Sequence, residues 1–364
     1  MDSKTFLYDY LNAFAPVGQE SEGQKIWANY VRKFSDTVKV DAYGTAYALL
    51  QGSTANQDLS HRYAQPYRVV IEAHCDEIAW IITQIEKDGY VRVKRAGGSD
   101  NMIAASKSVF IHTHKGQKVK AVFGSPAVHV RDKYTEMGPE QHELWLDLGV
   151  KSDEKVKELG VEVGCMVTFD DQFSELGDYY IGRSLDNKIG GYIIAEALRR
   201  IKENNHRLPY DLYVVNSVQE EVGLFGARKI AKELKADIAL VHDVCHNTNH
   251  PKMNKAKDGD IEGGKGPCVE FTAQNHRKLI NLYRETAEQH NIPLQLTVGS
   301  YGNDTVSFFL ENTPTAILAT PLKYMHTTVE MAHKNDVESV IDLFVKTLLN
   351  IDPYFIESVN NPSI

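Results

Sequence analysis

The sequence predicts an α/β fold in which a mixed sheet carries helices on both faces and a small β-rich domain is inserted into the chain. Two patterns lead to this prediction. In the C-terminal half, stretches of helical period alternate with short apolar runs. Between residues 78 and 173, short alternating strands separated by glycine turns replace that pattern. We therefore expect residues 1–77 and 174–364 to form the main domain and residues 78–173 to form the insert.

The first 77 residues are expected to contain two helices followed by strands. Apolar residues such as Phe6 and Tyr10 recur at helical spacing, and a second helical pattern runs through Ile26 and Tyr30. Extended runs follow at residues 37–40, 46–50 and 67–71, with a polar loop over residues 52–65. The run at 67–71 is apolar throughout and predicts a buried strand.

After the insert, helices and strands are expected to alternate. The predicted helices cover residues 189–202, 227–234, 277–290 and 336–349, and the predicted strands cover residues 212–218, 238–241 and 315–319. The polar stretch at residues 247–265 is expected to be a long loop. Loops that leave the carboxyl ends of such strands converge on one crevice, so a ligand site is expected there.

Composition narrows the classes of function. A formal net charge of −9, without a concentrated basic face, excludes a general nucleic-acid surface. Hydrophobic residues at 42% and charged residues at 24% are typical of a globular protein. No stretch approaches the roughly 18 apolar residues that span a bilayer, so no membrane association is expected. The N-terminus has no basic region followed by an apolar core, and we expect a cytoplasmic location.

The four cysteines form no CxxC pair, which excludes a zinc knuckle and a disulfide framework; they are Cys75, Cys165, Cys245 and Cys268. A reducing compartment follows. Cys75 and Cys245 flank candidate metal ligands. Because side chains alternate along a strand, both thiols are expected to point away from those ligands, as buried free cysteines.

Histidines and carboxylates gather in short segments that follow or border apolar strands. The segments are IEAHCDE (71–77), GRSLDNK (182–188), NSVQEEVG (216–223), VHDVCHN (241–247) and KYMHTTVEM (323–331). Mixed imidazole and carboxylate ligands suit zinc, cobalt or manganese, and a carboxylate can bridge two ions. Two ions about 3.5–4 Å apart are typical of dinuclear hydrolytic sites.

In the order and spacing of these segments, the chain resembles the M42 family of metallo-aminopeptidases, the glutamyl or deblocking group whose members have sometimes been labelled endoglucanases. The resemblance runs nearly end to end, from the N-terminal helices to the segment around His326. It implies a zinc-peptidase-like fold for the main domain. It also implies two divalent ions per subunit, zinc or cobalt with manganese as a further candidate, and peptide substrates with a free amino terminus.

The resemblance implies a role for each matching residue. His74 and Asp243 would complete one metal site, Glu221 and His326 would complete the other, and Asp186 would bridge the two ions. No position in this set is replaced.

Two further carboxylates receive roles from the same resemblance. Asp76 would hydrogen-bond to the imidazole of His74 and orient it. Glu220, the neighbour of a ligand but itself free of metal, would act as general base, taking a proton from the attacking water and returning it to the leaving amine.

Several positions depart from the family's usual pattern. Asn187 stands where a second aspartate is common, and Cys75 where methionine is common. These two changes remove no ligand. The family's GTDA element is GNDT at residues 302–305, and Thr327-Thr328 replace the Ser-Pro after the last histidine. The last two changes leave pocket shape and substrate preference open.

The insert, including LWLDLGVKSDEKVKELGVEVGCMV at residues 144–167, resembles the family's dimerisation domain. The resemblance implies a homo-oligomer, a tetrahedral assembly of twelve subunits in the family, whose enclosed active sites admit only peptides. His129 could then reach the active site of a neighbouring subunit.

Each candidate residue also has a structural interpretation when taken alone. His74 could be a satisfied core histidine, Asp186 could cap the helix that follows it, and Glu220 with Glu221 could form a solvated turn. The same holds for Asp243 and His326. Their joint occurrence in the expected order favours the metal site.

The alternatives to an aminopeptidase are a glycosidase, a dinuclear deacylase or carboxypeptidase, and a non-catalytic scaffold. A glycosidase would need two carboxylates about 5–9 Å apart across a sugar bond, which adjacent glutamates do not supply. A dinuclear deacylase or carboxypeptidase acting on N-acyl amino acids would use the same ligands, and only the need for a free α-amine separates it. A non-catalytic scaffold would predict loss of Glu220 or Asp186, and both are present.

Overall fold

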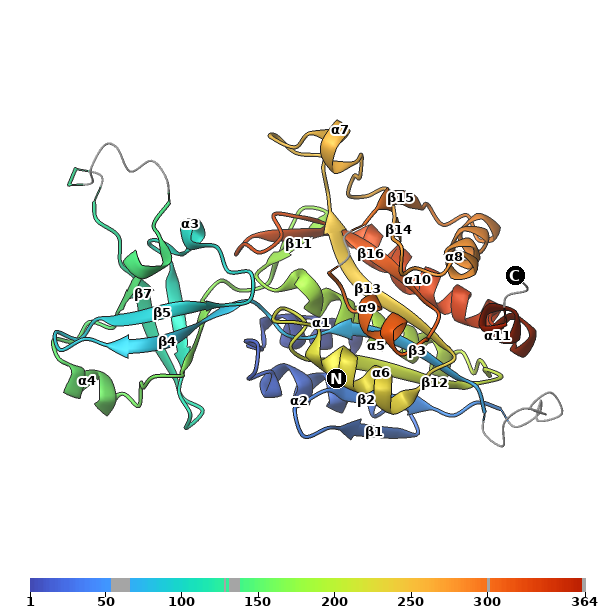
Figure 1. The fold of residues 1–364 in the computed structure, drawn as a ribbon, viewed down its shortest axis with the longest axis horizontal. Helices are drawn as coiled ribbons and strands as arrows, with labels where there is room; N and C mark the ends of the chain where they lie inside the picture. Colours follow the sequence, from blue (N-terminus) through green and yellow to red (C-terminus); the bar gives the residue numbers. More distant parts are fainter. Residues whose placement is uncertain (54–65, 128, 131–137, 300–301, 362–364) are drawn as a thin grey trace.

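The structure is a computed structural model that describes residues 1–53, 66–127, 129–130, 138–299 and 302–361. Most of the predicted polar loop, residues 54–65, lies outside the described residues. Figure 1 shows a large mixed sheet between helices, and a small closed barrel beside it. The mixed α/β fold that the sequence predicts is confirmed.

The large sheet is built around four parallel strands: β12 (Asp211–Ser217), β3 (Arg68–His74), β13 (Ile238–His246) and β16 (Thr315–Lys323). Next to β12 lie β2 (Ala46–Leu50) and then β1 (Thr37–Val40), both antiparallel. On the far side of β16 lie β17 (Glu330–His333), β11 (Tyr179–Gly182) and β10 (Ser174–Leu176). β14 (Cys268–Phe271) also pairs with β16, and β15 (Gln295–Val298) pairs with β14.

Alternation along the strands gives this sheet two apolar faces. On β3, Val69 and Ile71 point into one core and Val70 points into the other. The first core contains α1 (Ser3–Asn12), α2 (Ser21–Val31), α5 (Leu185–Glu203), α8 (Arg277–Gln289), α10 (Lys334–Asn350) and α11 (Pro353–Asn360). The second contains α6 (Phe225–Leu234) and α9 (Thr305–Leu310). Helices on both faces are therefore confirmed.

The separate barrel fits the predicted β-rich insertion, because its strands all lie between β3 and β10 in the chain. In order around the barrel they are β4 (Ala79–Ile85), β5 (Val91–Ala96), β8 (Trp145–Asp147), β7 (Lys118–Phe123), β6 (Ser108–His112) and β9 (Met166–Phe169). Trp80 packs edge-on against Phe123 and Phe169 in its core. The connections include α3 (Asn101–Ala104), the 3₁₀ turn η2 (Gln141–Glu143) and α4 (Asp153–Glu158).

The observed boundaries differ from the predicted ones where strands pair. β13 continues to His246, beyond the predicted end at residue 241, and so contains Asp243. β13 and β16 pair in parallel from Ala239 opposite Thr315 to His246 opposite Leu322. This mutual pairing extends both strands, an effect that the composition of either segment alone does not reveal. The predicted loop at 247–265 contains the short helix α7 (Lys255–Asp258).

Candidate metal centre

Three adjacent parallel strands end at the site. β3 ends at His74, which lies opposite Ser217 at the end of β12. Glu220 and Glu221 follow β12 in a turn, and Asp243 lies near the end of β13. The carboxyl ends of parallel strands meet at one edge of a sheet, so these four side chains converge there.

Two further segments complete the site from outside these strands. Asp186 lies in the first turn of α5, whose N-cap is Ser184, so Asp186 is not the cap. His326 lies in the loop between β16 and β17 with a φ of 61°. The two residues face each other across the strand ends.

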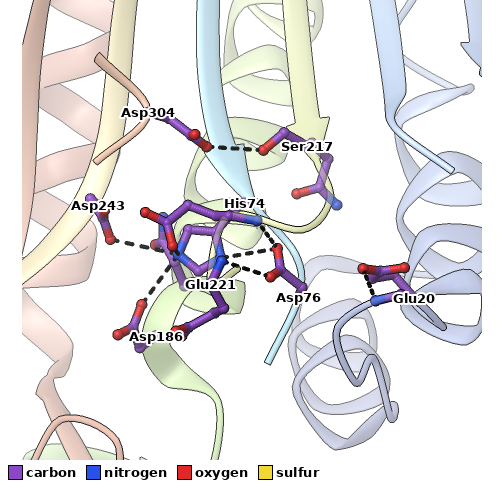
Figure 2. A network of polar contacts seen from close by, with 12 residues as sticks. Glu20, His74, Asp76, Asp186, Ser217, Glu221, Asp243 and Asp304 are labelled. Atoms are coloured by element: carbon purple, nitrogen blue, oxygen red, sulfur yellow. Dashed lines mark hydrogen bonds and ion pairs between the residues drawn. The ribbon is translucent and has the colours of Figure 1, made fainter. Parts of the chain in front are cut away.

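Asp186 lies between two imidazoles. Its Oδ1 is 3.3 Å from Nε2 of His74, and both residues are labelled in Figure 2. Its Oδ2 is 3.3 Å from Nε2 of His326. Nε2 of His74 is 3.8 Å from Oδ1 of Asp243 and 3.9 Å from Oε2 of Glu220. Nε2 of His326 is 3.4 Å from Oε1 of Glu221.

The ligand atoms fall into two groups, each lying within 4.8 Å of one another. The groups are His74, Glu220 and Asp243, and Asp186, Glu221 and His326. Asp186 also contacts the first group, one oxygen towards each side. A donor set of imidazole nitrogens and carboxylate oxygens suits zinc, cobalt or manganese. The residues present therefore fit a pair of divalent cations.

The electrostatics support this fit. Burial raises the pKa of Glu220 to about 10, against the opposing charge of His74. Burial also raises the pKa of Asp243 well above its usual range. For Asp186, contacts with His326 and His74 outweigh burial and lower the pKa. The side chains of Glu220 and Glu221 are only 11% and 6% exposed, so they do not form a solvated turn. Carboxylates crowded in a buried site destabilise one another unless cations offset them.

Asp76 holds the turn that carries the two glutamates. The backbone N–H of Glu220 donates to its Oδ1 at 3.0 Å, and the backbone N–H of Glu221 donates to its Oδ2 at 3.1 Å. Its Oδ1 is 3.5 Å from Nδ1 of His74, longer than a normal hydrogen bond. Orientation of the imidazole by Asp76 therefore stays a prediction. The hydrogen bonds from the turn to Asp76 are observed in the structure, and the sequence does not predict them.

Glu330 links two of the segments that carry candidate ligands. Its Oε1 accepts the backbone N–H of His326 at 2.8 Å, and its Oε2 accepts that of Asp186 at 3.1 Å. Glu330 is 2% exposed. The only sequence signal is an acidic residue four positions after His326, and its partners are backbone groups that no side-chain pattern encodes.

A buried ion cluster that the sequence does not predict lies next to the site. Arg183 pairs with Glu77, and Nζ of Lys188 lies 3.8 Å from the same carboxylate. Lys188 also donates to the carbonyl oxygens of Leu11 and Ala13 at the end of α1. The cluster ties the segment after β3, which carries Asp76, to the start of α5, which carries the candidate ligand Asp186. Its sequence signal is three charged residues flanking Asp76 and Asp186.

Two more buried carboxyl groups, those of Asp304 and Glu20, lie near the candidate ligands, and Figure 2 labels both. Oγ of Ser217 donates to Oδ2 of Asp304 at 3.1 Å, which places the GNDT segment beside His74. Oε1 of Glu20 accepts the backbone N–H of Gly18, and burial raises the pKa of Glu20 to about 8.

The barrel contributes a wall of the site through the glycines after β5. A Cβ added at Gly98 would lie 2.5 Å from Nδ1 of His326, and one added at Gly97 would lie 3.2 Å from Cβ of Glu221. Close approach of this loop therefore needs glycine. Lys107 also joins the barrel to the His326 loop by donating to Oγ1 of Thr328 at 2.7 Å.

Asn187, one of the departures from the family pattern, has a matching partner. Its Nδ2 donates to the carbonyl oxygen of His242 at 2.8 Å, and its Oδ1 lies 3.0 Å from Nδ1 of the same residue. Nε2 of His242 lies 2.8 Å from Oγ1 of Thr320. Burial lowers the pKa of His242 to about 3, so its imidazole is neutral. The neutral amide of Asn187 suits this neighbour, whereas an aspartate would place a charge beside it. His242 is a satisfied core histidine.

The cysteine prediction is half right. All four thiols are buried and free. Cys75 follows His74 directly, as expected for a side chain on the other face. The expectation that Cys245 points away from the ligands is wrong, because it lies two positions after Asp243 and so shares its face. Cys245 lines the same cavity as Asp243.

A cavity of about 610 Å³ lies over the ligands. It is lined by His74, Asp186, Glu220, Glu221, Asp243 and His326, and extends to β14 and β15. A second cavity, of about 590 Å³, lies between α2 and the turn after β6 and contains none of these ligands. Among the described residues, no helix has the length and apolar character to cross a membrane.

Comparisons with known proteins find one matching family model and several similar aminopeptidases. The sequence matches the M42 glutamyl aminopeptidase profile over residues 59–343. The lysyl aminopeptidase of Pyrococcus furiosus is 29% identical over 330 residues, which cover 89% of this chain and 90% of the relative. Aminopeptidase APDkam598 from the archaeon Desulfurococcus kamchatkensis has a TM-score of 0.90 at 27% identity, covering 100% and 99% of the two chains. The Pyrococcus horikoshii TET1 peptidase, which can assemble into a tetrahedron or a large octahedral shell, has a TM-score of 0.82 at 27% identity, covering 96% and 100%.

Proposed function

Because the chain belongs to the M42 glutamyl aminopeptidase family, it is a peptide hydrolase, and we propose that it removes residues from the free amino end of peptides with two divalent ions. The observation that carries the proposal is the position of Asp186, whose two oxygens each face a different imidazole at 3.3 Å. A carboxylate in this position suits a bridge between two ions.

The contacts between these residues support the proposed ligand set. His74 and Asp243 would hold one ion, Glu221 and His326 would hold the other, and Asp186 would be shared by both. Zinc or cobalt suits these ligands best, and manganese is also acceptable to them. When bound, the two ions would lower the pKa of an attacking water and polarise the scissile carbonyl.

Glu220 is the proposed general base. It neighbours Glu221, and its Oε2 lies 3.9 Å from Nε2 of His74, so it reaches the space between the ligands. Its carboxylate would accept a proton from the attacking water and return it to the leaving amine. Asp76 fixes this geometry by accepting the backbone N–H groups of Glu220 and Glu221.

Quaternary structure forms part of the proposal. Residues 78–173 would serve as a dimerisation domain inserted into a metallopeptidase domain of residues 1–77 and 174–364. The similarity to the TET1 peptidase supports a tetrahedral homo-oligomer. Light scattering after size-exclusion chromatography tests it, since the mass of a single chain would contradict assembly. A cytoplasmic location and a reach of His129 into a neighbouring site stay predictions.

The decisive experiment is hydrolysis of aminoacyl-p-nitroanilides beside their N-acetylated forms. Chelator-stripped protein is assayed with and without zinc, cobalt or manganese. Metal-restored cleavage confined to free amines is expected. Cleavage of the acetylated forms alone would favour the deacylase or carboxypeptidase alternative, and no cleavage with any metal would favour a scaffold. Asp186→Asn should abolish the restored activity, whereas Asp178→Asn, an exposed change of the same charge, should preserve it.

A further inference from the structure

The cavity over the candidate ligands contains a buried carboxylate that the proposed reaction does not use. Glu270 on β14 lines the cavity together with His74, Asp186 and His326. Glu270 is only 5% exposed. Among the described residues, no hydrogen-bond donor and no cationic side chain pairs with its carboxylate, and burial alone raises its pKa to about 7. An unpaired carboxylate in this position is costly for the fold unless something binds to it.

The strand register places Glu270 on the same face of the sheet as the ligands. Asp243 lies opposite Ala319 on β16, and Ala319 lies opposite Cys268 on β14. Glu270 follows Cys268 by two positions, so their side chains share a face. β14 and β13 are two strand spacings apart, about 10 Å. A long substrate side chain bound at the ligands can bridge much of this gap.

Because Gly299 has no side chain, it leaves room for the carboxylate of Glu270. A Cβ added at Gly299 would lie 1.8 Å from Oε2 of Glu270, so any other residue would displace the carboxylate. Thr297, which lies opposite Glu270 on β15, lines the same cavity. The surrounding residues therefore define the position of this carboxylate, which does not lie on an open surface.

The sheet surface between Asp243 and Glu270 is apolar. Cys245, Ile261, Cys268 and Ala319 form one buried cluster there. Cys245 and Ile261 also line the cavity. An apolar surface that ends in a buried anion matches a side chain with an alkyl stem and a cationic end.

Apart from the candidate ligands, the other charged residues that line the cavity are more exposed than Glu270. Arg228 and His246 line it but are exposed, so water screens them. Asp258, half-buried, adds a second carboxylate. A glutamyl side chain that entered this cavity would meet a buried group of like charge, which is unfavourable.

We propose that the cavity over the candidate ligands receives the side chain of the substrate's N-terminal residue, that Glu270 determines which side chain it accepts, and that it accepts lysine or arginine. The inference rests on the proposed aminopeptidase function. The family profile and one relative carry the names glutamyl and lysyl aminopeptidase respectively, so family membership does not decide between the two charges.

The test compares lysyl, arginyl, norleucyl and glutamyl p-nitroanilides with the metal-loaded protein and with Glu270→Gln. Norleucine has the alkyl stem of lysine without its ammonium. We expect the wild type to prefer lysyl over norleucyl substrate in kcat/KM by roughly 10- to 100-fold, the range for a charge-assisted hydrogen bond. Glu270→Gln should lose most of this preference and keep its norleucyl activity.

A binding measurement gives a second readout. Inhibition by free L-lysine and L-norleucine should show the same preference in the wild type and lose it in Glu270→Gln. Asp260→Asn is the matched control, because it removes one charge between the cavity-lining residues Asp258 and Ile261, at a side chain that is 68% exposed and paired with Lys255. This variant should change neither ratio by more than about twofold.

The outcomes separate the inference from the function on which it rests. If the wild type cleaves norleucyl or glutamyl substrate better than lysyl, or if Glu270→Gln lowers all substrates equally, Glu270 does not set specificity and the aminopeptidase function stands. If no free aminoacyl substrate is cleaved with any metal, both the function and the inference fail.

Discussion

Oε2 of Glu330 accepts a hydrogen bond from the backbone N–H of Asp186 at 3.1 Å, although the two residues are 144 positions apart in the chain. The other oxygen of the same carboxylate accepts the backbone N–H of His326 at 2.8 Å. One buried side chain thus fixes the start of α5 and the loop before β17 relative to each other. Both segments carry candidate metal ligands, so their spacing depends on Glu330.

Glu330→Gln should weaken metal binding without unfolding the chain. The glutamine amide retains one acceptor oxygen, but its NH₂ group would face a backbone N–H, leaving a buried donor unsatisfied at a cost of about 1–3 kcal/mol. We expect metal affinity to fall by about 10- to 100-fold, measured by competition with a chelating dye. The control Glu338→Gln, at a side chain that is 57% exposed, should bind metal like the wild type. Equal affinity in all three proteins would rule out the positioning role of Glu330.

The two adjacent glutamates should give different phenotypes. Glu220→Gln removes the proposed base, and kcat should fall by about 10²- to 10⁴-fold while metal content stays the same. Glu221→Gln removes a proposed ligand, and metal content should fall first, with part of the activity returning at high metal concentration. Metal analysis of the purified variants beside their kinetics tests the pair. Full turnover by Glu220→Gln with metal bound would remove it as the base.

Gly98→Ala should disturb the site from the barrel side. The added Cβ would lie 2.5 Å from Nδ1 of His326, so the imidazole must move away from Asp186 and Glu221. Activity and metal affinity should both fall, while the melting temperature of the chelated protein changes little. Gly23→Ala on α2 is the control, because it adds the same methyl group away from the ligands, where the nearest atom, Cβ of Ala15, lies at 3.4 Å. If both variants behave like the wild type, the barrel loop does not constrain His326.

His112 on β6 should make stability depend on pH. Burial lowers its pKa to about 4, and the nearby cations Lys118 and Arg183 act in the same direction while Glu77 opposes them. The unfolded chain, with a histidine pKa near 6.5, binds a proton more readily between pH 6.5 and 4 than the folded chain does, so stability falls as pH falls through this window.

His112→Gln should reduce this acid sensitivity, because glutamine can keep a hydrogen bond to Thr168 and has no proton to gain. On the order of 2 kcal/mol of the wild-type loss between pH 8 and pH 5 should disappear, measured by urea unfolding at both values. His114→Gln, at a side chain that is 48% exposed, serves as the control and should follow the wild type. An unchanged pH dependence in His112→Gln would show that this imidazole is not held neutral.

The sequence by itself predicted the four central parallel strands, the longer helices and the kinds of side chain that gather at the site. Apolar runs such as residues 67–71 can bury only as strands or helices, and their lengths and flanking residues decide which. Histidine and carboxylates placed directly after those runs predict a site at the strand ends. The structure brings the seven predicted residues together, from His74 to His326, and their individual roles stay predictions.

Only the tertiary structure decided what holds those residues and what surrounds them. The clamps made by Asp76 and Glu330 bind backbone N–H groups, which every residue possesses, so no sequence pattern marks them. The position of Gly98 against His326, and the placement of Glu270 two strands from Asp243, arise from segments far apart in the chain. Local sequence sets which faces are apolar and which groups can bind a metal, whereas long-range packing sets which of those groups meet.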